Sequence, residues 1–86
     1  MEGVILISRL FHVGQEIPRV ENDLRECREL LAAFWEHLPP VEEDVIIERM
    51  HTILHNISYL TNRKRALHEE QQALIIQAVT FACGET

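Results

Sequence analysis

The chain is poor in the residues that break helices, cross-link chains or build catalytic loops. Its 86 residues include three glycines, three prolines and two cysteines. It has no Gly-rich phosphate loop, no nucleophile elbow and no Cys-His motif of known spacing, so we expect a non-catalytic protein without cofactor or metal. Cys27 and Cys83 cannot form a dense disulfide scaffold and are not a C-x-x-C pair, so reduced thiols and a cytoplasmic location are expected.

Basic residues and long apolar runs are also scarce. Eight Lys and Arg stand against 14 Asp and Glu, which gives a net charge of −6. This balance argues against general binding to nucleic-acid phosphates. The apolar run from Val4 to Ile7 is too short to span a membrane, and no basic segment precedes it as in a signal peptide. With 47% apolar residues, residues 1–86 are expected to form one globular domain.

The C-terminal half contains an uninterrupted heptad pattern. Residues at alternating spacings of four and three lie along one seam of an α-helix. The seam positions are Ile46, Met50, Ile53, Ile57, Leu60, Lys64, Leu67, Gln71, Leu74, Ala78 and Phe81. The pattern predicts one long helix over about 41–83. A kink near Thr61 and Asn62, which have low helix propensity, is the alternative.

A shorter heptad predicts a second helix over about 18–37. Its seam positions are Val20, Leu24, Cys27, Leu31, Phe34 and Leu38. Pro18 suits the first position of a helix, and Pro39 with Pro40 ends it. The two heptads therefore predict an antiparallel pair of helices joined by a turn.

Residues 3–13 are expected to form a short helix that ends at Gly14. A strand is the alternative, because Val4 to Ile7 are apolar and mostly β-branched. The predicted fold is thus all-α: a helical hairpin with a short N-terminal helix and a long C-terminal helix. Because the far end of the long helix extends beyond the short one, we expect the hairpins to assemble as a dimeric bundle.

The end of the long helix is apolar around most of its circumference, which is typical of a helix that is buried on several sides. We therefore expect it to bind a second subunit or a protein partner. Trp35, near the turn, is a further candidate because Trp is enriched at binding hot spots, with core packing as the alternative. The candidate partner-binding residues are Trp35, Leu74, Ile75, Ile76, Val79 and Phe81.

One basic cluster interrupts the long helix. Arg63, Lys64 and Arg65 are the candidate contacts for nucleic-acid phosphates. The favoured interpretation is a solvated face whose charges pair with Glu69 and Glu70 within helical reach. The predicted function is thus protein binding, and nucleic acid is the alternative.

Two other polar features have simple interpretations. His51 and His55 have the spacing of two metal ligands on one helix face, but nothing nearby completes a site, so solvated histidines are expected. Lys64 and Gln71 interrupt the apolar seam, and polar residues at such positions often fix the register or the oligomeric state.

The hairpin over residues 18–83, with its turn segment Phe34–Pro39, resembles in outline the small helical antiactivators that sequester quorum-sensing transcription factors in bacteria. The resemblance implies inhibition of a transcriptional activator by direct contact. Phage-type inhibitors and secretion chaperones have similar proportions and are alternatives. A dimeric four-helix nucleic-acid-binding protein is the alternative from another class.

Overall fold

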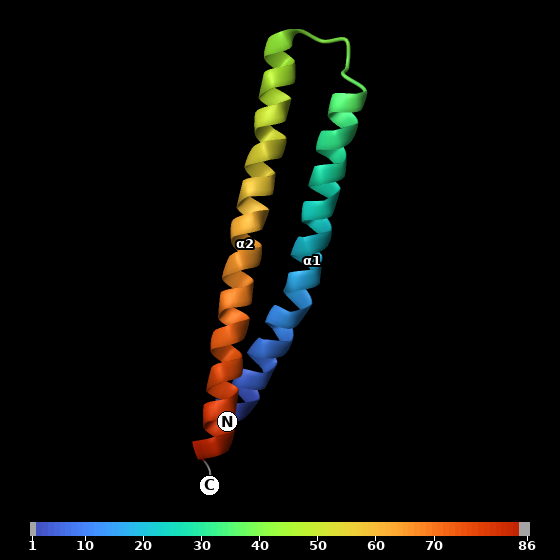
Figure 1. Cartoon of the computed structure of the whole chain (residues 1–86). Coiled ribbons are helices and arrows are strands. Elements are labelled where there is room, and N and C mark those ends of the chain that lie inside the picture. Colours follow the sequence, from blue (N-terminus) through green and yellow to red (C-terminus); the bar gives the residue numbers. More distant parts are fainter. Residues whose placement is uncertain (1, 85–86) are drawn as a thin grey trace.

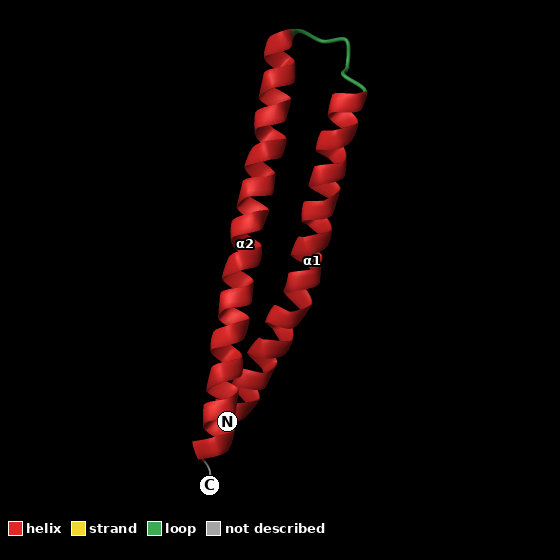
Figure 2. Cartoon of the chain, viewed as in Figure 1, coloured by secondary structure: helices red, strands yellow, loops and turns green. Residues whose placement is uncertain are grey.

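The computed structural model describes residues 2–84, which form an antiparallel hairpin of two helices (Figures 1 and 2). The first helix, α1, spans Glu2–Glu36, and the second, α2, spans Glu43–Gly84. The hairpin is a rod of 67 × 17 × 15 Å with a radius of gyration of 19.3 Å. A compact protein of this length has a radius of gyration of about 12 Å. Residues 2–84 therefore form a rod of one pair of helices, with no third described element against either long side.

The predicted division of the N-terminal part is wrong. Residues 3–13 are neither a separate short helix nor a strand, because α1 continues through Gly14 and Pro18 to Glu36. No glycine among residues 2–84 has the positive φ that a C-terminal glycine stop usually adopts. The two arms are therefore similar in length, with 35 residues in α1 and 42 in α2. The expectation that the far end of α2 extends past a short arm does not hold.

Packing explains why α1 is continuous. The four-and-three spacing of its seam begins upstream of Pro18, at Leu6, Leu10, Val13 and Ile17, and all four side chains are at least half buried. An interior proline costs a helix about 3 kcal/mol, because it removes one hydrogen-bond donor and crowds the preceding turn. Burial of a seam side chain contributes about 1.5–3 kcal/mol, so a few such residues offset that cost.

Pro18 also shapes α1. It has no N–H to donate to the carbonyl of Gly14, four residues earlier, and prolines are the ordinary cause of helix bends. Figure 1 shows α1 curving towards α2 over its N-terminal part. The curvature brings the N-terminal turns of α1 to the C-terminal end of α2, where a Cβ on Gly3 would lie 3.4 Å from the Phe81 ring.

The second helix passes through Thr61 and Asn62 without a break. The hydroxyl of Thr61 donates to the carbonyl oxygen of Ile57 at 2.7 Å. That bond satisfies the hydroxyl within the helix, which is how threonine is accommodated at mid-helix positions. Because α2 is continuous, its seam residues stay on one side of the helix along its whole length. They run from the turn to the opposite end of the rod, which we call the open end.

The turn between the helices comprises residues 37–42. Its backbone is held by a bond from the Val41 N–H to the Pro39 carbonyl at 2.8 Å. Two amides of the first turn of α2, those of Val45 and Ile46, donate to the carbonyl of Glu42. Glu43 and Asp44 lie in the first turn of α2, where the helix dipole favours negative charge.

The core is a strip of seam residues in the middle of the rod. Val13, Ile17 and Val20 of α1 are buried against Leu67 of α2, and Val13 and Leu67 are only 1% and 2% exposed. The seam positions predicted for α2 are buried or half-buried throughout, except Phe81 at the open end. The described part of the core is therefore one apolar seam between two helices.

Candidate functional site

The histidine pair of α2 lies on the outside of the hairpin. His51 and His55 are both exposed, in a shallow depression that also includes Asp44 and Glu48. Among residues 2–84, no three His, Cys, Asp or Glu side chains lie close enough together to hold a metal ion. The side chains of this depression therefore do not bring together enough ligands to coordinate a metal ion.

The basic cluster pairs across the hairpin rather than along α2. Arg63 donates a hydrogen bond to Glu16 at 2.8 Å, and the ammonium of Lys64 lies 3.9 Å from a carboxylate oxygen of Glu21. Both acids belong to α1. The prediction that Glu69 and Glu70 pair with the cluster is therefore wrong, because α1 brings other carboxylates within reach.

Two further charged residues near the cluster, Arg65 and Glu70, also have hydrogen-bond partners. Arg65 donates to the side-chain oxygen of Asn62 at 3.2 Å. Glu70, one of the predicted partners, instead accepts a hydrogen bond from Arg9 at 2.6 Å. Within the described cluster, carboxylates therefore compensate the charges of Arg63 and Lys64, whereas the charge of Arg65 has only a neutral amide beside it.

The predicted partner-binding residues do not form one surface. Trp35 lies at the turn end of α1, 53% exposed, with its ring edge-on to Phe34 at a centroid distance of 6.3 Å. The other candidates lie near the open end of α2. They divide between two sides of the rod, with Leu74, Ile76 and Phe81 in one groove and Ile75 and Val79 outside it.

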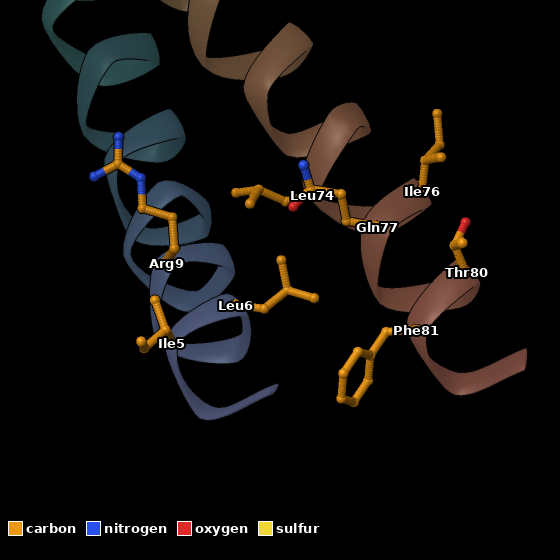
Figure 3. A pocket seen from close by; sticks show the side chains of 8 residues that line it. All are labelled: Ile5, Leu6, Arg9, Leu74, Ile76, Gln77, Thr80 and Phe81. Carbon is orange, nitrogen blue, oxygen red and sulfur yellow. The ribbon is translucent and has the colours of Figure 1, made fainter. Parts of the chain in front are cut away.

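That groove is the most clearly apolar depression of the described hairpin. It lies between the helices at the open end and has a volume of about 560 Å³. Figure 3 shows Leu6, Leu74 and Phe81 directed into the space between the helices. The complete lining is Ile5, Leu6, Arg9, Leu74, Ile76, Gln77, Thr80 and Phe81.

Two of the interhelical ion pairs identify one long side of the hairpin. Arg9 with Glu70, and Glu16 with Arg63, join the two helices. Each of these residues directly precedes a seam residue of its own helix. Seam positions of two kinds alternate along each helix. In an antiparallel pair, the residues that directly precede seam positions of one kind lie on one side of the rod in both helices. The residues that directly follow seam positions of the other kind lie on the opposite side. Since Arg9 lines the groove, the groove is on the ion-pair side.

The opposite side carries a stripe of exposed apolar side chains, which we call the lateral face. Its central residues directly follow seam positions, and the others lie one helical turn away on the same side. All are exposed despite their size. They are Val4, Ile7, Phe11 and Trp35 of α1 with Ile47, Leu54, Ile75 and Val79 of α2.

Sequence reasoning missed most of the groove and most of the lateral face. Ile5, Leu6 and Arg9 were not candidates, because residues 3–13 were assigned to a separate element of uncertain type. The available signal was the four-and-three spacing that runs from Leu6 through Pro18 without a phase shift. A longer window would have joined the segment to α1 and placed its apolar residues beside the end of α2.

Together, the groove and the lateral face give this hairpin two apolar surfaces on opposite sides, which is more than single exposed side chains provide. Neither helix contains an apolar stretch long enough to cross a lipid bilayer within residues 2–84. Comparison with protein-family models, with curated proteins and with solved structures found no match to this chain.

Proposed function

We propose that the protein is a non-catalytic cytoplasmic regulator that binds an amphipathic helix of a larger protein in the groove, and so inhibits or sequesters that protein. The groove at the open end is the observation that carries the proposal. Its volume of about 560 Å³ falls within the usual range of about 300–1,000 Å³ for binding pockets. Its lining is mostly apolar, which favours apolar anchors over a polar substrate.

An incoming helix suits the shape of this site. A groove between two helices accepts the apolar face of a third, with anchors at spacings of three, four and seven residues. Leu6, Leu74 and Phe81 would contact such anchors, and each buried anchor contributes about 1.5–3 kcal/mol. Arg9 and Glu70, joined at the rim, are available to pair with the polar flank of the partner helix.

Charge favours a partner with basic flanks. The chain carries a net charge of −6, and complementary charge increases the association rate more than the final affinity. A helix with lysine or arginine on its polar face would be steered towards the hairpin. We expect this part of the binding to weaken as the salt concentration rises.

The proposed target is a transcriptional activator, by analogy with the small helical antiactivators that this hairpin resembles. Contact with DNA is not part of the proposal, because Arg63 and Lys64 are paired with carboxylates of α1. Inhibition would follow from occupying a helix that the activator needs for dimerisation or for DNA binding.

The test compares groove variants with an exposed control. Tagged wild-type chain is expressed in its native host, and the protein that co-purifies is identified, purified and titrated. Ile5→Glu and Ile76→Glu should each weaken binding at least about tenfold, or 1.4 kcal/mol, because a carboxylate must be desolvated. Tyr59→Glu, exposed and outside both apolar surfaces, should change affinity less than about twofold.

A DNA-binding partner allows a second measurement. Wild-type chain should release that partner from its DNA without binding the DNA itself. The proposal is wrong if both groove variants bind the partner as wild type does. Salt-sensitive binding of duplex DNA by the chain alone, lost when Arg63, Lys64 and Arg65 become Ala, would support the nucleic-acid function instead.

A further inference from the structure

We infer that the lateral face is occupied by a second copy of this chain, so that two hairpins form a four-helix bundle and both grooves remain open. This inference concerns a different surface from the proposed function and does not depend on it. The lateral face lies opposite the Arg9–Glu70 and Glu16–Arg63 ion pairs. It carries exposed apolar residues at both ends of the rod, Ile7 and Ile75 at one end and Trp35 and Ile47 near the turn.

The hairpin exposes more surface than a stable single chain of its mass. Its accessible surface is 6749 Å². A compact monomer of 10.0 kDa is expected to expose about 5,200 Å². The excess, about 1,500 Å², arises because two helices can bury only one stripe each. A second layer of helices is the usual way to bury the rest.

The size of the lateral face matches that of a homodimer interface. A side of the rod measures 67 × 17 Å, or about 1,100 Å² for each copy. Two copies packed face to face would bury about 2,300 Å², which falls in the range of about 2,000–5,000 Å² for obligate homodimers. Such interfaces are more apolar than average surface, as the two ends of this face are.

A two-fold axis along the rod gives the best match of residues. It places α1 of one copy against α2 of the other, antiparallel, as in the hairpin itself. Ile7 then faces Ile75 of the second copy at the open end, and Trp35 faces Ile47 of the second copy near the turn. Apolar side chains meet at both ends of the bundle, and each groove lies on an outer side.

One pair of charges in the middle of the face, Glu21 with Arg65, is complementary in the same arrangement. Glu21 of α1 lies at the level of Lys64, whose ammonium is 3.9 Å away, and Arg65 is the next residue of α2. The two-fold axis brings Glu21 of each copy to Arg65 of the other. Opposite charges at the centre fix the register and disfavour a slipped dimer.

Sedimentation equilibrium of the purified chain tests the inference with a matched pair of variants. Ile5 and Ile7 are 68% and 67% exposed, but they lie on opposite sides of the rod. The wild type should have twice the 10.0 kDa chain mass at micromolar concentration. Ile7→Glu and Ile75→Glu should raise the dimer dissociation constant at least about 100-fold, because each dimer then buries two carboxylates. Ile5→Glu should change it less than about threefold.

Cysteine cross-linking tests the same contact with a milder substitution. Chains in which Cys27 and Cys83 are replaced by Ala receive Ile7→Cys or Ile75→Cys. After oxidation, a mixture of the two should give a covalent dimer. A mixture of Ile5→Cys with Ile75→Cys should give none, because the two cysteines lie too far apart.

Three results would overturn the inference. The first is a wild-type chain that stays monomeric up to about 100 µM. The second is Ile5→Glu dissociating the dimer as strongly as Ile7→Glu. The third is equal cross-linking in both mixtures. These measurements use the chain alone, so a failure to dimerise does not contradict the proposed binding of a partner in the groove. A failure to bind a partner in the groove likewise does not contradict the dimer.

Discussion

Replacing Gly14 with alanine has opposite effects in a continuous α1 and in two helices joined by a link. In the structure Gly14 is an interior helical residue without positive φ, and a Cβ built on it meets nothing within 4 Å. Alanine at such a position stabilises a helix by about 0.5–1 kcal/mol relative to glycine. If Gly14 instead ended a helix with positive φ, alanine would strain the backbone and destabilise the fold.

Pro18→Ala also distinguishes a continuous α1 from two helices joined by a link. Inside a helix the change restores an N–H donor for the carbonyl of Gly14 and removes the clash of the ring with the preceding turn. We expect the free energy of unfolding to rise by about 1–3 kcal/mol. At the first position of a helix, by contrast, proline is favourable and its loss would be neutral or slightly destabilising.

Thermal and urea unfolding followed by circular dichroism, at one fixed chain concentration, distinguishes the two architectures. A change of 1 kcal/mol shifts the Tm of a domain of this size by about 4–8 °C. Ala66→Gly, at an exposed position within α2, should lower stability by about 1 kcal/mol in either architecture and calibrates the assay. A lower Tm for both Gly14→Ala and Pro18→Ala would refute the continuous helix.

Three further predictions concern the seam and its ion pairs. Leu67→Ala should lower the free energy of unfolding by about 2–5 kcal/mol in urea denaturation, because its side chain is 2% exposed, whereas Leu30→Ala, on the surface, should change it by less than about 1 kcal/mol. A double-mutant cycle between Glu16 and Arg63 should give a coupling of about 0.2–1 kcal/mol that falls as salt is raised, since the pair is partly exposed to solvent; a larger, salt-independent coupling would contradict this. Lys64→Leu should stabilise the hairpin by about 1 kcal/mol or more through added apolar burial at a seam position, and its chevron plot should assign the gain mainly to slower unfolding if the contact forms late.

The sequence was sufficient to predict α2 because its signal is long and internally consistent. Eleven seam positions keep one phase over ten turns, and no glycine or proline interrupts them. Low helix propensity at Thr61 and Asn62 amounts to a few tenths of a kcal/mol per residue. That cost is small beside the burial of Ile53 and Leu67 on the same seam, so the helix continues.

The same comparison explains the error in α1. Gly14 and Pro18 are strong local signals, worth about 1 and 3 kcal/mol, and they lie four residues apart as a helix end and a helix start would. When these two residues are considered without tertiary contacts, they predict a break between two helices. In the folded chain they compete with burial of Val13, Ile17 and Val20 against α2, and that tertiary term is larger.

The candidate site was only partly predictable for a related reason. Ile75 and Ile76 are neighbours in the sequence, yet one belongs to the lateral face and the other lines the groove. Assigning them needs the side on which α1 lies, which the heptad of α2 alone does not specify. The ion-pair partner of Arg63 also could not be predicted from α2 alone. Glu16 is 47 residues away in the chain, and only the alignment of α1 along α2 brings the two side chains together.

The position of the groove relative to the core bears on how a partner would bind. The buried seam residues of α1 run from Val13 to Leu24, whereas the groove lies beyond them, where Leu6 is half-buried and Phe81 is exposed. Fewer buried contacts make this end easier to open locally than the middle of the rod. A partner helix could therefore displace Phe81 at little cost to the core. Because the lateral face lies on the other side, dimerisation would leave two such grooves on one bundle, and a dimeric activator could engage both at once with a gain in avidity.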